Sequence, residues 1–208
     1  MNVFVETNFV LELALQQQER LACEDLLNLA SVGQIKLYLP AYSLVEPHET
    51  LTRRHRERKQ LGSDVSRELT QLARTAPLAQ RAEASQIVVQ LLIESAEEEA
   101  RQLEEVKVRI VSVAEIIPLT HDVVRQASEC QSKYDLSPQD AIVYASIRAT
   151  LEREHADLNC FVSRNPADFD DPDLREDLST VKCKYFSSFT TALQFIRHSI
   201  ARDVQFDQ

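Results

Sequence analysis

The segment that decides the fold is the opening Val3-Phe4-Val5-Glu6-Thr7-Asn8. Its β-branched and aromatic residues favour a buried strand, so residues 3–5 are predicted to form one. The strand gives way to Glu6 and then to Thr7 or Asn8, either of which can cap a following helix. A strand that runs directly into a helix is typical of a parallel α/β sheet, and its acid then lies at the carboxyl end of the strand.

The rest of the chain repeats this alternation. Further strands are predicted at 35–39, 116–119, 160–162 and 182–186, and helices at 19–30, 41–60, 64–76, 82–105, 122–133, from 138 to about 155, and at 190–201. Gly33 stands just past the end of a predicted helix, and Gly62-Ser63 is expected to interrupt another. Alternating strands and helices favour a parallel sheet with helices on both faces. We expect one domain over residues 1–208, with residues 52–105 as a helical elaboration of one crossover.

Composition excludes several kinds of site. The chain has two glycines in 208 residues, so neither a dinucleotide-binding glycine motif nor a P-loop can be present. Its four cysteines and five histidines lack metal-binding spacing, which argues against zinc catalysis and a disulfide framework. The net charge of −10 disfavours tight binding of nucleic acid by the whole surface.

No targeting or membrane signal is expected. The N-terminus lacks a basic region followed by a long apolar stretch, and the apolar run at 87–93 is far too short to cross a bilayer. These features predict a cytoplasmic protein that does not enter a membrane.

Four acids are expected at the carboxyl edge of the predicted sheet: Glu6, Glu46, Asp140 and Asp168. Glu6 directly follows the first strand, and Asp168 lies six residues after Val162. Asp140 falls in the first turn of one helix, and Glu46 lies one or two turns into another. Because ligands of open parallel sheets bind beyond this edge, we expect these carboxylates to converge there.

Each acid also has a purely structural interpretation. Glu6 can serve a helix dipole, and Glu46 can lie on an exposed helix face. Asp140 is the third helical residue after Ser137 and can take part in a capping box, a role compatible with metal binding. Asp168 can be an ordinary loop acid, and three neighbours compete with it: Asp170, Asp171 and Asp173.

A convergence of carboxylates requires a compensating charge. Carboxylates at close range repel one another and raise each other's pKa. Oxygen-only ligation suits Mg²⁺ or Mn²⁺, and such ions can activate water for attack on a phosphodiester. The acids therefore predict a divalent-metal centre.

Four segments together resemble the PIN domain. VFVETNFVL (residues 3–11) looks like its opening motif, a hydrophobic strand followed by Asp-Thr-Asn and a hydrophobic helix. PAYSLVE (40–46) is similar to the second motif, with an acid in the helix after the second strand. LSPQDAIVYA (136–145) resembles the third, in which an Asp-Ala pair opens a helix. FVSRNPADF (161–169) resembles the fourth, a strand followed by Thr/Ser-Arg-Asn/Asp and Asp-Phe.

The resemblance implies an α/β fold of the three-layer α/β/α PIN type, with a central parallel sheet, a helical insertion, and Mg²⁺- or Mn²⁺-dependent cleavage of RNA. By carry-over, Glu6, Glu46, Asp140 and Asp168 are the candidate catalytic metal ligands. The polar supports that orient them would be Thr7 or Asn8, and Ser163 or Asn165. Toxins of bacterial toxin–antitoxin pairs share this fold, so an antitoxin-like protein and a second copy of the chain are implied partners. Two departures matter: Glu6 replaces the usual aspartate, and Asn165 stands where many relatives have an acid.

The basic run RRHRERK (residues 53–59) is the candidate RNA-contacting patch, with Arg53, Arg54, Arg56, Arg58 and Lys59 as its cations. The alternative is a solubilising helix face, because no aromatic residue interleaves with the cations. Two functions follow from the sequence. The first is a metal-dependent endoribonuclease, and the second is a catalytically weakened PIN domain that binds RNA or protein.

Overall fold

The computed structural model describes the backbone of residues 1–154 and 156–206, and the side chains of these residues up to Arg202. This part of the chain contains one five-stranded sheet in which every neighbouring pair is parallel, in the order β3-β2-β1-β4-β5. The strands are β1 (Asn2–Val5), β2 (Lys36–Pro40), β3 (Glu115–Ile117), β4 (Asn159–Val162) and β5 (Cys183–Phe186). The predicted parallel sheet is confirmed.

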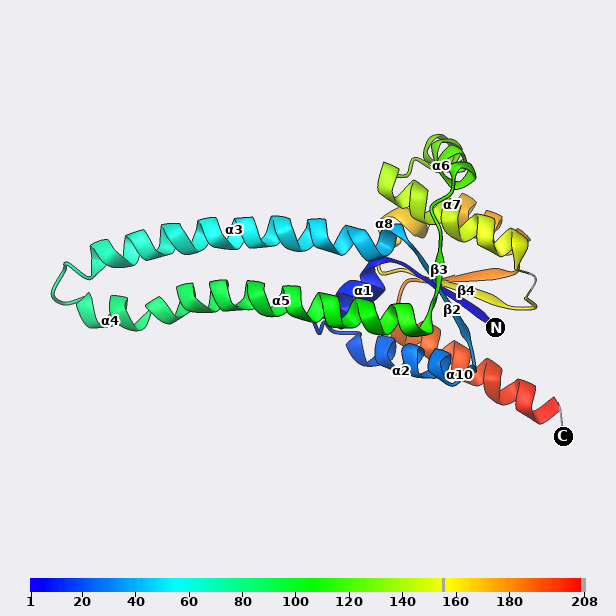
Figure 1. Ribbon diagram of the computed structural model, residues 1–208, viewed down its shortest axis with the longest axis horizontal. Coiled ribbons are helices and arrows are strands. Elements are labelled where there is room, and N and C mark those ends of the chain that lie inside the picture. The colour runs from blue at the N-terminus through cyan, green and yellow to red at the C-terminus, as the bar shows by residue number, and fades with distance from the viewer. Residues whose placement is uncertain (155, 207–208) are drawn as a thin grey trace.

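Helices cover both faces of the sheet, which gives three layers (Figure 1). Successive side chains of a strand point to opposite faces, so β1 contributes to two cores. Val3 and Val5 pack in one core with helices α1 (Thr7–Ala14), α2 (Arg20–Ser31), α5 (Gln86–Val113) and α10 (Phe189–Phe206). Phe4 packs in the other core with helices α6 (His121–Tyr134), α7 (Pro138–Arg153), α8 (Pro166–Phe169) and α9 (Pro172–Thr180).

The order of the strands fixes where a ligand can bind. From β1 the chain builds outward through β2 to β3, then returns through α6 and α7 to place β4 on the other side of β1. The strand order therefore reverses between β1 and β4. In open α/β sheets this switch point leaves a crevice beyond the carboxyl ends of the two strands.

The helical elaboration is a long hairpin that projects from the sheet (Figure 1). It consists of α3 (Tyr42–Leu72), the short α4 (Ala79–Ala84) and α5. The predicted interruption at Gly62-Ser63 is wrong, because α3 runs through both residues without a break. Gly62 is buried and faces α5, where a β-carbon on it would contact Val89 Cγ1 at 3.8 Å, so close helix packing sustains the helix there.

Several element boundaries differ from the sequence prediction. α5 begins at Gln86 and reaches Val113, beyond the predicted end at 105, and α9 was not predicted. Gly33 follows α2 with φ +73°, as expected for a glycine past a helix end. The predicted helix end near residue 155 lies outside the described residues. None of the described helices combines the length and apolar character needed to cross a membrane.

Candidate metal centre

Glu6 and Ser163 lie side by side at the crevice between β1 and β4. The two strands are in register with Val5 opposite Val162, so the next residue of each, Glu6 and Ser163, emerges at the same edge. Both residues are buried. The strand order thus brings the first and fourth predicted motifs together, although they are far apart in the sequence.

Glu6 is itself the N-cap of α1, a role that the sequence prediction gave to Thr7 or Asn8. Its backbone is extended, with φ −132° and ψ −165°, and its Oε2 accepts a hydrogen bond of 2.9 Å from the Asn8 N–H. The other carboxylate oxygen, Oε1, is buried and has no hydrogen-bond partner. Capping therefore uses one oxygen of Glu6 and leaves the second available.

Burial raises the pKa of Glu6 to about 7. The hydrogen bond from Asn8 and the proximity of the Ser163 hydroxyl oppose this rise, and the nearby charge of Glu46 adds to it. A carboxylate that is desolvated and faces a second acid is costly to ionise without a cation. The Glu6 carboxylate therefore favours binding of either a proton or a cation.

Glu46 is held next to α1 by a hydrogen bond that the Thr7 hydroxyl donates to its Oε2. This bond places Thr7, one of the predicted polar supports, in contact with one of the four acids. Burial raises the pKa of Glu46, and the charges of Asp140 and Glu49 contribute in the same direction. Glu46 is therefore electrostatically linked to Glu6 on one side and to Asp140 on the other.

Asp140 is both part of a helix start and part of the acid group. Ser137 caps α7 by accepting a 3.2 Å hydrogen bond from the Asp140 N–H, which confirms it as the N-cap. The Ser137 hydroxyl also donates to Asp140 Oδ2 at 2.5 Å. Burial raises the pKa of Asp140, the Ser137 hydroxyl opposes this, and the charge of Asp168 adds to it.

Asp168 completes the series from the short helix α8, not from an irregular loop as expected. The Asn165 side-chain amide donates a hydrogen bond to Asp168 Oδ2, so Asn165 supports this acid. Two competing acids have other roles: Asp171 caps α9, and Asp170 forms an ion pair with Arg175.

The electrostatic links thus run from Glu6 to Glu46, from Glu46 to Asp140, and from Asp140 to Asp168. Every potential metal ligand in this series is a carboxylate oxygen, which suits a hard cation such as Mg²⁺ or Mn²⁺. The unpartnered Glu6 Oε1 also fits a cation. As the side chains are placed, no three histidine, cysteine or acidic residues of the described chain are gathered closely enough to hold one ion together.

Sequence reasoning did not identify Tyr42, which lies beside the acids. Burial raises the pKa of its phenol, and the charges of Glu46, Glu49 and Asp140 raise it further. Tyr42 precedes Glu46 by four residues on α3, so the two side chains share a helix face. The four-residue spacing between Tyr42 and Glu46 is the sequence feature that could have identified Tyr42.

A second missed feature anchors the loop that carries Asn165 and Asp168. The Arg164 guanidinium forms an ion pair with Glu12 of α1, whose side chain is 2% exposed, and lies 3.7 Å from Glu19 Oε2. Glu19 in turn accepts hydrogen bonds from Ser188 and from the Phe189 N–H at the start of α10. These contacts tie the end of β4 to α1 and α10.

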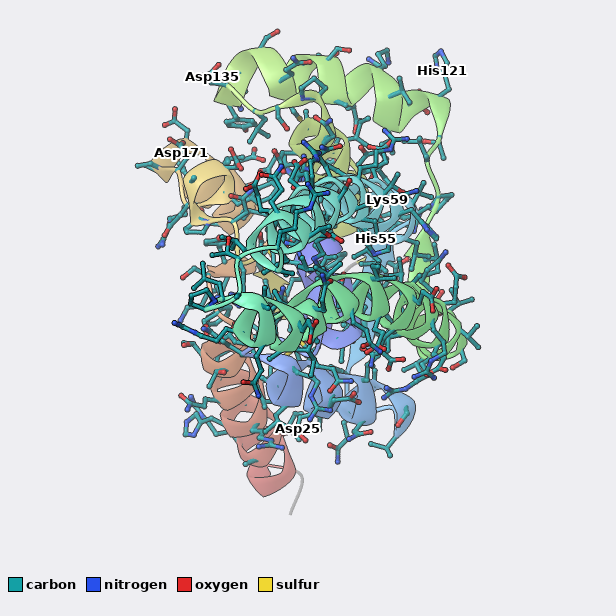
Figure 2. The ribbon with its side chains drawn as sticks, turned by 90° about the vertical axis from the view of Figure 1, so that its left-hand side faces the viewer. Asp25, His55, Lys59, His121, Asp135 and Asp171 are labelled. Atoms are coloured by element: carbon teal, nitrogen blue, oxygen red, sulfur yellow. The ribbon has the colours of Figure 1, made fainter. Side chains whose placement is uncertain are left out.

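The basic run divides into internal and external cations. Arg58 Nη1 donates to Glu99 Oε1 of α5 at 2.8 Å and to Ser95 Oγ at 3.1 Å, so it is used within the hairpin. Figure 2, a view along the hairpin from its tip, shows the labelled His55 between α3 and α5, consistent with its 3.7 Å approach to Glu99. Arg53 is exposed and lies seven residues after Glu46, on the same helix face.

A family model described as PIN domain matches residues 3–169 of the chain. The chain belongs to the PIN-domain family. The resemblance predicted from the four motifs is therefore confirmed, and the match includes the long hairpin and ends with α8. PIN domains are generally nucleases.

Comparison with solved structures gives a distant similarity. The crystal structure of VapBC2 from Rickettsia felis bound to a DNA fragment from their promoter aligns with a TM-score of 0.46 and 11% sequence identity. The alignment covers 89% of this chain and 99% of that chain. No curated protein matches the sequence.

Proposed function

We propose that the chain is a single-domain, divalent-metal-dependent endoribonuclease. The observation that carries this proposal is the series of four electrostatically linked acids at the switch point of a PIN-family sheet. Linked, partly desolvated carboxylates repel one another, and a divalent cation offsets that repulsion. Such an arrangement suits hydrolysis of a phosphodiester bond.

In this proposal Glu6, Glu46, Asp140 and Asp168 hold Mg²⁺ or Mn²⁺. When bound, such an ion would make a water ligand more acidic and would stabilise negative charge on phosphate oxygens. The chain's other residues position the acids: Thr7 holds Glu46, the Asn8 N–H holds Glu6, Ser163 lies beside Glu6, and Asn165 holds Asp168. The Asn8 N–H is the partner of Glu6 Oε2, and the unpartnered Oε1 is available to the ion.

The hairpin offers a path for RNA toward the acids. Arg53, Arg56 and Lys59 are exposed on α3, and Arg53 shares the face of Glu46. Seven residues of helix correspond to about 10 Å. These cations attract the phosphate backbone without base specificity.

The deciding experiment incubates labelled single-stranded RNA with the purified chain and Mn²⁺ or Mg²⁺. We expect cleavage that chelator and Asp140→Asn abolish. The matched control is Asp122→Asn, because Asp122 also lies in the first turn of a helix but outside the acid series. Cleavage that survives Asp140→Asn, or an unmodified chain with neither cleavage nor Mn²⁺ binding by calorimetry, would contradict the proposal.

A second function is favoured by one observation: the described acids are not gathered around one point. Together with the longer Glu6 side chain, this suits a PIN domain that binds RNA or protein without cleaving it. RNA binding without cleavage in the same assay would support this function. An antitoxin-like protein and a second copy of the chain remain predictions from family membership, and a cytoplasmic location remains a prediction from the sequence.

A further inference from the structure

The outer half of the hairpin buries few of its own residues. Between residues 59 and 100 of the described chain, only Gly62 and Ala82 are buried. Nearer the sheet, by contrast, α3 buries Leu51, and α5 buries three apolar residues: Leu103, Val106 and Ile110. Two helices that pack only against each other bury little apolar surface. A further apolar contact would therefore stabilise the outer half more than the half nearer the sheet.

One face of this outer half is apolar. Leu61 and Leu72 on α3 and Val88 and Leu91 on α5 are between 43% and 63% exposed. Leu61 immediately precedes Gly62, and Val88 immediately precedes Val89, its contact in the other helix. Positions just before the packed residues of two antiparallel helices fall on the same side of the pair. We call these four residues the hairpin face.

The edges of the hairpin face are acidic. On α3, Glu57 lies four residues before Leu61, and Glu68 lies four residues before Leu72. On α5, Glu94 and Glu98 lie three and seven residues after Leu91. These spacings place the acids along the same two helix lines as the apolar residues. Glu98 forms an ion pair with Arg101. Within the described chain, Glu57, Glu68 and Glu94 have no ion-pair partner.

We propose that the hairpin face binds an amphipathic helix of a protein partner whose apolar stripe is flanked by lysine or arginine. The apolar floor would bury the stripe, and the acidic edges would pair with the cations, as in other helix-in-groove interfaces. From Leu61 to Leu72 the face is about 16 Å long, which accommodates about three turns of a partner helix. A second copy of the chain fits less well, because its own hairpin face brings acidic edges.

The test uses a fluorescein-labelled 21-residue peptide with Leu at heptad positions a and d and Lys at e and g, titrated with the full chain by fluorescence anisotropy. We expect binding that weakens about tenfold in Leu91→Ser, since one buried leucine contributes at least that factor. The matched control is Ile93→Ser. Ile93 is similarly exposed at 55% but lies on the opposite flank of α5, so this substitution should leave the affinity unchanged.

The charge requirement is tested separately. Glu68→Gln should weaken binding, whereas Glu97→Gln, on the other flank of α5, should not; a peptide with Glu at e and g should not bind. Absence of binding, or equal losses in Leu91→Ser and Ile93→Ser at unchanged helicity by circular dichroism, would overturn the proposal. A dimer of the unmodified chain by light scattering that Leu91→Ser alone dissociates would also overturn it, because the occupant would then be a second copy. These outcomes are independent of RNA cleavage.

Discussion

At the scale of single residues, Glu6 combines two demands that conflict. Its Oε2 caps α1, while its buried Oε1 has no partner. Capping fixes the carboxylate at the crevice, and burial penalises its charge. This conflict is physically sustainable if a proton or a cation occupies the site, and it makes Glu6 the residue most sensitive to pH and metal.

Stability without metal should therefore fall as pH rises. The pKa of Glu6 in the folded chain is about 7, above its ordinary value of 4.5, so the folded chain retains a proton that the unfolded chain releases. Glu6 lowers the free energy of unfolding between about pH 4.5 and pH 7 by roughly 3 kcal/mol. Urea denaturation across this range should show the slope, and Glu6→Gln should flatten it.

The control for this slope is Glu94→Gln, an exposed glutamate that should leave the pH dependence unchanged. Mn²⁺ should raise the melting temperature more at pH 8 than at pH 5, and Glu6→Gln should remove most of that rise. An unaltered slope in Glu6→Gln would show that the buried carboxylate is not its source.

The two glycines should respond oppositely to alanine. Gly33 has φ +73°, so Gly33→Ala should destabilise by about 1 kcal/mol even though its β-carbon meets no atom within 4 Å. Gly62 lies inside α3, and its β-carbon would make an ordinary contact with Val89, so Gly62→Ala should stabilise α3 by about 0.5–1 kcal/mol. Hydrogen exchange of the hairpin amides would resolve the second effect. The same sign for both substitutions would contradict this interpretation.

At the scale of elements, the loop from β4 to α8 depends on a contact across the fold. Arg164→Ala should lower the free energy of unfolding by about 2–3 kcal/mol, because it leaves Glu12 buried without its cation. Arg164 is 34% exposed, which keeps this loss below that of a fully buried pair. The double variant Glu12→Gln/Arg164→Ala should recover part of the loss. Urea denaturation measures both, and a double variant less stable than Arg164→Ala would contradict the argument.

The sequence predicts elements well where the signal is local. The short apolar strands, Gly33 at a helix end and Ser137 as an N-cap are all set by neighbouring residues, and all are confirmed. The prediction failed at Gly62-Ser63, because packing against Val89 continues the helix where local propensity ends it. The ion pair of Arg164 with Glu12 joins residues 152 positions apart, so no local pattern indicates it.

At the scale of the whole molecule, strand order determines the site. Motif order and spacing led to the prediction of four acids at the carboxyl edge, whereas the reversal between β1 and β4 is what brings the first and fourth motifs to one crevice. The predicted polar supports Thr7 and Asn165 do contact acids of the series. Tyr42 was missed because its role depends on which way α3 leaves the sheet, and that follows from packing.

The arrangement of the hairpin relative to this crevice separates the cations that contact RNA from those that stabilise the fold. Arg53→Gln/Arg56→Gln should weaken binding of single-stranded RNA and reduce the slope of log affinity against log salt by about 1.4, or roughly 0.7 for each lost phosphate contact. Arg58→Gln should instead lower the melting temperature, because Glu99 loses its 2.8 Å partner inside the hairpin.

Both variants should be made in an Asp140→Asn background, so that RNA is bound and not cleaved during fluorescence anisotropy. Arg67→Gln/Arg125→Gln removes the same charge from exposed positions farther along α3 and on α6, and it serves as the control. Its salt slope should match that of the parent, because cations remote from the crevice release no counterions from the bound strand. If this control lowers the slope as much as Arg53→Gln/Arg56→Gln, RNA is attracted by net charge alone, and α3 does not guide it to the acids.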